Sequence, residues 1–324
     1  MERPGRCAAE EREVNTPKRH HYLPQSYLRL FAKDDVIWVY DRDTNGIRPQ
    51  KVIDTAVISH FNAVERKDGS RDVRIETELS KIEGLIPKLV DDLKARRRLD
   101  DASRFDLAFI AALMMTRTPE FHEGVQRVEG KLIKRFAQHM FRSEEDAARS
   151  LAEWKAEDPT APDIDPKALF RIYSEGAFNI NIHRNRSIEL MLKLSPEFAK
   201  TLFTLNIGVL HAPKNSAFIT TDRPLAVLPP RDTTGLPKWG GIGLLTPGAH
   251  KYLSLSSDVA VVFGDAGDNF VHLDLKTGTA RWVNAAVGRM TNRFLFGRDE
   301  LLVAAWSRRL RLSDTPKISG MDVA

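Results

Sequence analysis

The sequence predicts an α+β fold, in which a central helical region packs with N-terminal and C-terminal β-rich segments in one compact unit. Short runs of strand-forming residues separated by turn residues occur at both ends of the chain. Between them, apolar residues recur at spacings of three and four, which is the period of an amphipathic helix. The order strands, helices, strands favours an α+β fold over the regular alternation of a parallel sheet. We expect one domain over residues 18–312, divided into β-rich 18–65, helical 75–205 and β-rich 206–300.

The N-terminal part is expected to form a small sheet. Residues 35–42 are rich in Val, Ile, Trp and Tyr, and the run Asp-Thr-Asn-Gly at 43–46 has the chemistry of a tight reversal. We expect a second strand over residues 51–57 and a third over residues 61–65.

The spacing becomes helical from Glu76. Pro87 lies inside the first helical pattern, where it removes a backbone hydrogen bond, so we expect a kink there. One face of this helix would carry Leu79, Ile82, Ile86, Leu89 and Leu93. A second apolar helix over residues 105–113 is expected to end at the Thr-Pro pair 118–119. Further helices are expected over 121–141, 144–155, 167–193 and 197–205.

Beyond residue 205 the sequence returns to short apolar runs separated by Pro and Gly. We expect strands at 207–211, 217–221, 252–255, 259–263 and 270–273. A basic amphipathic helix over 280–292 and a strand over 293–296 would complete the C-terminal part.

The formal net charge of +5 is concentrated in one segment. Residues 281–312 hold seven arginines against one aspartate and one glutamate, which accounts for the whole excess. A second basic cluster spans residues 94–98. Such patches can neutralise phosphates, so the sequence permits a nucleic-acid partner. For either patch alone, a solvated helix face or a salt-bridged surface is the better explanation.

The chain has the features of a cytoplasmic protein with no membrane segment. The one cysteine, Cys7, excludes a disulfide framework within the chain. The longest apolar run, residues 107–115, is far shorter than a membrane-spanning helix. Residues 1–18 lack the apolar core of a secretory signal. We expect residues 1–17 to be a disordered tail and residues 313–324 to be a second tail.

Residues 20–31, His-His-Tyr-Leu-Pro-Gln-Ser-Tyr-Leu-Arg-Leu-Phe, gather several chemically active groups. Imidazole changes protonation near neutral pH, so His21 is a candidate general base, general acid or metal ligand. A helix that begins after Pro24 would place His21, Gln25 and Arg29 on one face, where the arginine could bind an anion. Alternatively, His21 and Gln25 satisfy buried backbone groups and hold this segment in place.

Arg117 lies on the apolar side of its predicted helix, at i+4 from Leu113 and i+8 from Phe109. A charge on a core-facing surface needs a partner. Glu83, which borders the apolar stripe of the preceding helix, is the natural one. Arg117 therefore forms either a buried structural ion pair or part of a pocket that holds an anion.

Asp222 follows a predicted strand directly and precedes an Arg-Pro pair. Catalytic carboxylates and metal ligands often occupy such strand ends. The alternative is a turn in which Asp222 accepts hydrogen bonds from nearby backbone.

These motifs resemble those of an uncharacterised bacterial domain-of-unknown-function family. The resemblance rests on His-Tyr-x-Pro-Gln-x-Tyr-Leu-Arg at the start, Tyr-Asp-Arg at 40–42, and Glu-x-x-Leu-x-x-Ile-Glu at 76–83. Arg-Thr-Pro at 117–119 and Thr-Asp-x-Pro at 221–224 follow in the same order. It implies a shared fold and a shared site, and it supplies no activity. Asn284 also matches a family position.

The candidates favour a phosphodiester-directed hydrolase, in particular a nuclease that acts on RNA or DNA. His21 would be a base or metal ligand, Asp222 a metal ligand or orienting carboxylate, and Arg117 a stabiliser of negative charge. Mg²⁺ or Mn²⁺ would be the cofactor. Expected substrate-binding residues are His20, Gln25, Tyr27, Arg29, Glu83 and Asn284. The alternative is a non-catalytic module that senses a nucleotide or another anion in the same pocket. We expect His21, Gln25, Arg117 and Asp222 to meet in one polar pocket, with Glu83 beside Arg117.

The sequence lacks the motifs of several common enzyme classes. It contains no Walker loop, no G-x-G-x-x-G, no G-x-S-x-G and no H-E-x-x-H. These absences argue against a P-loop NTPase, a standard Rossmann dehydrogenase, an α/β-hydrolase and a zincin.

Overall fold

Strand β13 (Phe294–Gly297) joins the two ends of the chain in one sheet. It pairs antiparallel with β2 (Val36–Asp41) on one side and with β8 (Thr220–Thr221) on the other. β2 also forms a hairpin with β3 (Gly46–Lys51), which gives a four-stranded sheet in the order β3-β2-β13-β8. The N-terminal and C-terminal β-rich segments therefore belong to one α+β unit, as predicted.

The computed structural model describes residues 19–230, 232, 242–265, 267 and 269–312. The two predicted tails, residues 1–17 and 313–324, lie outside the described residues. Within the described ranges, no helix is both long enough and apolar enough to cross a membrane.

A second sheet has five strands in the order β12-β7-β11-β10-β9. Its neighbouring strands are antiparallel except for β12, which runs parallel to β7. The strands are β7 (Asn206–His211), β9 (Leu225–Leu228), β10 (His250–Ser254), β11 (Val259–Gly264) and β12 (Phe270–Asp274).

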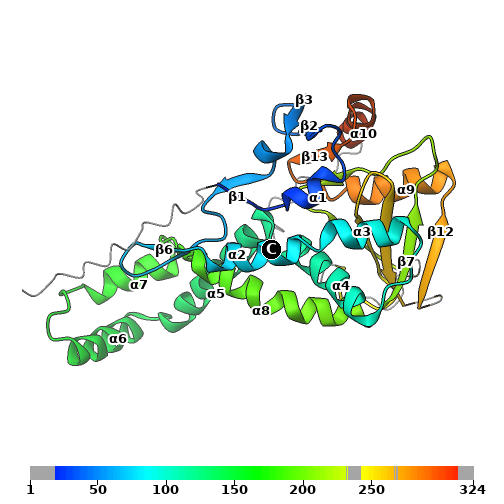
Figure 1. Ribbon diagram of the computed structural model, residues 1–324. Helices are drawn as coiled ribbons and strands as arrows, with labels where there is room; N and C mark the ends of the chain where they lie inside the picture. Colours follow the sequence, from blue (N-terminus) through cyan, green and yellow to red (C-terminus); the bar gives the residue numbers. More distant parts are fainter. Residues whose placement is uncertain (1–18, 231, 233–241, 266, 268, 313–324) are drawn as a thin grey trace, which may run out of the picture.

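Helices cover both faces of the five-stranded sheet. Successive side chains of a strand point to opposite faces, so both faces of these apolar strands can be buried. Leu210, Tyr252 and Ala260 face α9 (Thr277–Gly288), and the alternate residues Val209 and Val261 join the main core. Helices that contribute to that core include α3 (Ile86–Lys94) and α4 (Asp101–Thr116). Figure 1 shows the sheet at one end of the molecule, between α9 and this helical layer.

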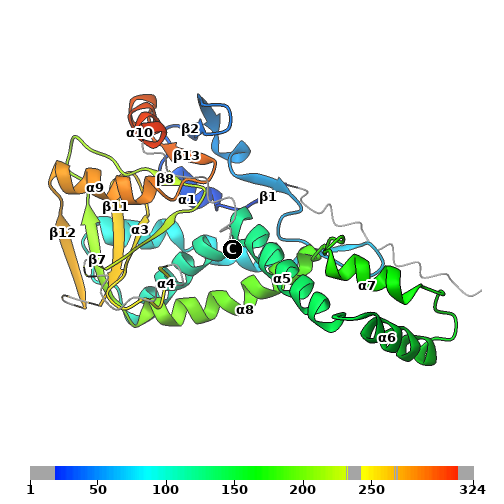
Figure 2. The same cartoon turned by 180° about the vertical axis from the view of Figure 1, so that it is seen from behind.

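The helical middle forms a layer and a projecting arm. α4 packs along α8 (Arg184–Phe203), and the far end of α5 (Pro119–Met140) leads away from them. The arm ends in α6 (Glu144–Glu157) and α7 (Pro166–Ser174), which pack on each other. Figures 1 and 2 show the arm extending away from the two sheets.

The remaining elements connect the two sheets to the helices. β1 (Arg19–His21) pairs antiparallel with β4 (Val57–Ser59), and β5 (Val64–Glu65) pairs with β6 (Arg71–Asp72). The helical connections are α1 (Gln25–Arg29), the 3₁₀ turn η1 (Val52–Asp54), α2 (Arg74–Glu83) and α10 (Glu300–Leu312).

Four sequence expectations about these elements are wrong. The helix expected over 167–193 is divided in two, because α7 ends at Ser174 and α8 begins at Arg184. Pro87 does not kink one long helix, because α2 ends first and Pro87 lies in the first turn of α3, where its missing N–H costs nothing. α8 continues through Pro196 rather than breaking before it, with Ser195 hydrogen-bonded to Thr116 of α4. The expected strand at 51–57 is instead η1 followed by β4. Helix α10 was not predicted.

Candidate functional site

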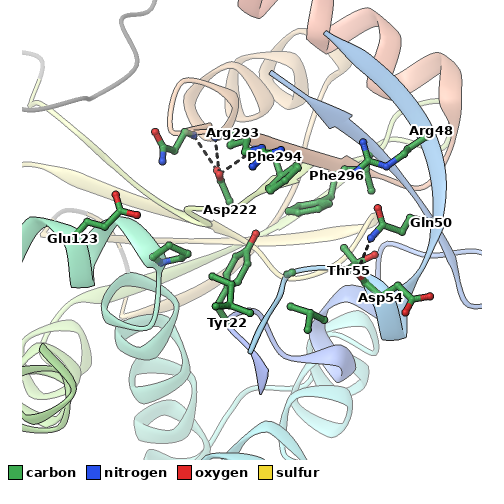
Figure 3. A pocket seen from close by; sticks show the side chains of 16 residues that line it. Tyr22, Arg48, Gln50, Asp54, Thr55, Glu123, Asp222, Arg293, Phe294 and Phe296 are labelled. Atoms are coloured by element: carbon green, nitrogen blue, oxygen red, sulfur yellow. Dashed lines mark hydrogen bonds between the residues drawn. The ribbon is translucent and has the colours of Figure 1, made fainter. Parts of the chain in front are cut away.

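A polar cleft of about 380 Å³ lies on one face of the four-stranded sheet (Figure 3). The opposite face of this sheet packs against α10 through Tyr40 and Leu295. Successive side chains of a strand point to opposite faces of the sheet, so the residues next to Tyr40 and Leu295 face away from α10, toward the cleft. Those cleft-facing residues are Val39, Arg48, Gln50, Phe294 and Phe296. The other walls come from Tyr22, residues 54–58, Pro119, Glu123, Asp222, Asn292 and Arg293.

Asp222 holds the turn that leads into β13. Its carboxylate accepts backbone N–H groups from Asn292 at 3.0 Å, Arg293 at 2.7 Å and Phe294 at 3.0 Å. Its own N–H donates to the carbonyl of Phe294 at 3.0 Å. Burial raises the pKa of Asp222, and the three N–H donors oppose this rise because they favour the charged form. The strand-end carboxylate is thus occupied by backbone groups (Figure 3).

Arg117 forms the ion pair with Glu83 that its position predicts. Its guanidinium also donates to the backbone carbonyl of His21 at 2.5 Å and lies 3.5 Å from Glu76 Oε2. Arg117 is 2% exposed, so these partners replace water around the charge. Burial raises the pKa of Glu83, whereas the charge of Arg117 lowers it. The contacts of Arg117 thus link α2, the end of α4 and the last residue of β1.

His21 is buried and satisfied by backbone. Its Nδ1 lies 2.9 Å from the carbonyl oxygen of Thr55, so Nδ1 must carry the proton. Burial lowers the pKa of His21, which favours the neutral imidazole. His20 is also buried and accepts the N–H of Asn62 at its Nδ1, 3.1 Å away. The two histidines of β1 therefore hold the segment around β4 in place through hydrogen bonds to its backbone.

The other predicted substrate-binding residues have structural partners as well. Gln25 accepts a hydrogen bond from Arg29 at 2.9 Å, and Arg29 also pairs with Asp35 on the surface. Tyr27 is fully buried, where it donates to the carbonyl of Ser254 at 2.7 Å. Asn284 accepts the N–H of Ile219 and donates to the carbonyl of Ala217, which fixes α9 to the chain before β8.

The predicted meeting of four side chains in one pocket is wrong. Of His21, Gln25, Arg117 and Asp222, only Asp222 lines the cleft. Arg117 and His21 meet beside it through a backbone carbonyl, and Gln25 pairs on the surface. Each polar group has a partner in the backbone or in another side chain, so a shared cavity is not needed to satisfy it.

The described residues also offer no metal centre. Within those ranges, no group of three or more His, Cys, Asp or Glu side chains is placed to hold a metal ion. The two candidate ligands, His21 and Asp222, use Nδ1 and both carboxylate oxygens for backbone groups.

The residues that make the cleft distinctive were missed by the sequence analysis. Arg48 and Gln50 lie two apart on β3, and Phe294 lies on β13. These residues come together because β2 pairs with β13, and the local sequence pattern does not predict that pairing. The hairpin turn at 43–46 was the available signal, since it identifies the strand that carries Arg48 and Gln50.

Ala56, which lines the cleft, has a left-handed backbone with φ of 56°. This conformation costs a non-glycine residue about 1 kcal/mol or more. The carbonyl of Ala56 accepts the N–H of Tyr22 at 2.9 Å, so the strained residue is held by the segment that follows β1.

We expect Ala56→Gly to raise the free energy of unfolding by about 0.5–1 kcal/mol, because glycine adopts positive φ without a steric cost. Urea unfolding followed by circular dichroism measures the difference. Ala32→Gly is the control. Ala32 does not have a positive φ, so this substitution should lower the free energy of unfolding by about 1 kcal/mol. An equal loss in both variants would contradict the strain at Ala56.

The chain is thus an α+β protein whose two terminal segments build one sheet beside a polar cleft. A family model described as "Protein of unknown function (DUF4238)" matches residues 19–300. The chain therefore belongs to the DUF4238 family, in agreement with the resemblance noted in its motifs. No curated protein and no solved structure gives a significant match.

Proposed function

We propose that the protein is a non-catalytic nucleotide-binding module whose ligand occupies the cleft. The observation that carries the proposal is the combination of an aromatic wall, an unpaired amide oxygen and a weakly paired arginine around one cavity. A volume of about 380 Å³ lies within the range of small-molecule sites in proteins.

The aromatic wall suits a planar base. Phe294 is partly buried, and its ring lies 6.2 Å from that of Phe296 at an interplanar angle of 28°. The Tyr22 hydroxyl points into the same space (Figure 3). Stacking of a base on an aromatic side chain contributes about 1–3 kcal/mol to binding.

Gln50 offers a hydrogen-bond acceptor that the fold does not use. Its Nε2 donates to the carbonyl of Asp54 at 2.6 Å, which fixes the amide. Its Oε1 is buried and accepts no hydrogen bond from the part of the chain that the structure describes. Such an orphan acceptor costs about 1–3 kcal/mol. Because Gln50 lines the cleft, an exocyclic amino group of a bound base that reached Oε1 would recover that cost.

Arg48 is the cation best placed for a phosphate. Its side chain is 47% exposed, and its guanidinium lies 3.9 Å from Asp41, beyond hydrogen-bonding distance. Arg293, in contrast, donates to both carboxylate oxygens of Asp41 at 3.0 Å. These hydrogen bonds hold the pKa of Asp41 below its usual value. A phosphate can therefore bind Arg48 without breaking the Arg293–Asp41 pair.

Calorimetric titration with AMP, UMP and inorganic phosphate tests the proposal. We expect saturable binding of a nucleotide, and a loss of about tenfold or more in affinity for Arg48→Ala and for Phe294→Leu. Arg29→Ala is the matched control, because Arg29 is another exposed, carboxylate-paired arginine that lies outside the cleft. Equal affinities in Arg48→Ala and Arg29→Ala, or no nucleotide binding by the wild type, would contradict the proposal.

The hydrolase hypothesis is tested on the same samples. Labelled RNA and DNA are incubated with the protein and Mg²⁺ or Mn²⁺. Because His21, Arg117 and Asp222 are committed to backbone and ion-pair partners, we expect no turnover that depends on them. Cleavage that disappears in a folded His21→Ala variant would favour the hydrolase instead.

A further inference from the structure

A second cavity, of about 290 Å³, lies between α9, α10 and the chain before β8. Three arginines line it, and they come from three elements. Arg281 lies on α9, Arg298 follows β13, and Arg309 lies on α10. The cavity is separate from the cleft, and its lining shares no residue with it.

Positive charge exceeds negative charge in this arginine pocket. Asp299 is the one carboxylate in its lining, and both of its oxygens are used: Oδ2 accepts from Arg298 at 3.2 Å, and Oδ1 caps α10 through the N–H of Leu302. Among the described residues, neither Arg281 nor Arg309 has a carboxylate oxygen within 4.0 Å. Three guanidinium groups against one carboxylate leave a net charge of two in the lining.

The walls of the arginine pocket are held in place. Arg309 lies over the ring of Trp306 at 4.6 Å, and that tryptophan is 6% exposed. Asn284, which also lines the pocket, ties α9 to the backbone of Ala217 and Ile219. Ordered walls reduce the entropy lost on binding.

The sequence alone allowed a simpler explanation of these charges. The basic segment 281–312 could have been a solvated surface, with each arginine facing water. Three of its seven arginines line one cavity together with the polar residues Asn215 and Ser216, and Arg281 and Arg309 remain exposed there. An anion that enters this cavity from solvent would therefore meet arginines from three different elements, which a flat solvated helix face does not offer.

We propose that the arginine pocket binds a small phosphate-bearing anion. The planar guanidinium group donates two parallel hydrogen bonds to phosphate oxygens, and a phosphate dianion matches the net charge of two. The proposal does not depend on nucleotide binding in the cleft.

Calorimetric titration of the full chain with pyrophosphate tests the arginine pocket. We expect saturable binding that weakens as salt is added, and a loss of about tenfold or more in affinity for Arg281→Gln. Arg308→Gln is the matched control, because Arg308 is an exposed arginine of α10 that does not line the pocket. The affinity of Arg308→Gln for pyrophosphate should stay within about twofold of the wild-type value, as should that of Arg48→Ala.

Three results would overturn the proposal. The first is the absence of saturable pyrophosphate binding by the wild type, and the second is the same affinity in Arg281→Gln and Arg308→Gln. The third is a short single-stranded RNA that binds more tightly than pyrophosphate and depends on Arg281, since the occupant would then be nucleic acid. Thermal unfolding of each variant ensures that any loss of binding occurs in folded protein.

Discussion

Asp222→Ala is expected to lower the free energy of unfolding by about 4 kcal/mol, one of the two largest effects that we predict. The carboxylate accepts three backbone N–H groups at 2.7–3.0 Å, and alanine leaves all three without an acceptor. Each unsatisfied buried donor costs about 1–3 kcal/mol, and water entering from the cleft recovers part of that sum. Urea unfolding at neutral pH measures the loss.

Asp222→Asn gives a graded test of the same interaction. The one remaining oxygen can keep the two N–H groups of Arg293 and Phe294, but the new amide faces the N–H of Asn292. We therefore expect a loss of about 2 kcal/mol, between wild type and alanine. Asp274→Ala is the control, because this carboxylate is 75% exposed and should change stability by less than about 0.5 kcal/mol. An Asp222→Ala variant as stable as Asp274→Ala would show that the hydrogen bonds of Asp222 do not stabilise the fold.

Arg117→Met is expected to cost about 4 kcal/mol. Methionine fills much of the space of the arginine side chain, so the loss reports the removed charge rather than a cavity. Glu83 would keep a carboxylate that is 17% exposed without its ion-pair partner, and the carbonyl of His21 would lose its donor. Chemical unfolding of the purified variant measures the change.

The second substitution in the pair separates charge from packing. Adding Glu83→Leu to Arg117→Met removes the orphaned carboxylate, so we expect the double variant to recover about 2 kcal/mol. Arg149→Met is the surface control, because Arg149 is 66% exposed and its pair with Asp146 should contribute less than about 1 kcal/mol. A double variant less stable than Arg117→Met alone would contradict a buried ion pair at this position.

The Arg117–Glu83 pair shows what local patterns can predict. A charged residue at i+4 and i+8 from apolar residues must be buried when the helix packs, and burial requires a partner. The spacing of Leu79 and Glu83 then identified the carboxylate at the edge of the facing helix. Both steps use helical periodicity alone, so the pair could be found without any knowledge of the tertiary structure.

His21 and Asp222 show where this reasoning stops. The sequence identified both as constrained residues, but a hydrogen bond to the Thr55 carbonyl or to the N–H groups of residues 292–294 involves backbone far away in the chain. Backbone partners leave no signature in side-chain identity. Residue type therefore indicated that His21 and Asp222 are constrained, but it could not distinguish a structural role from a catalytic one.

The cleft itself depends on strand pairing. Phe294 faces it because β13 pairs with Asp41 at that residue, and a shift by one residue would point Leu295 there instead. Helix α10 covers the opposite face and so fixes which face is available. Neither the register nor this helix was predicted, and the cleft residues Arg48, Gln50 and Phe294 were missed for that reason.

Photolabelling with an azidoadenosine monophosphate, followed by mass spectrometric mapping of the labelled peptides, tests whether the cleft binds a nucleotide. We expect labels within residues 48–58 and 292–296, and their loss when unlabelled AMP is added in excess. Labels that AMP displaces from another part of the chain, or no displaceable label at all, would contradict a nucleotide site in the cleft.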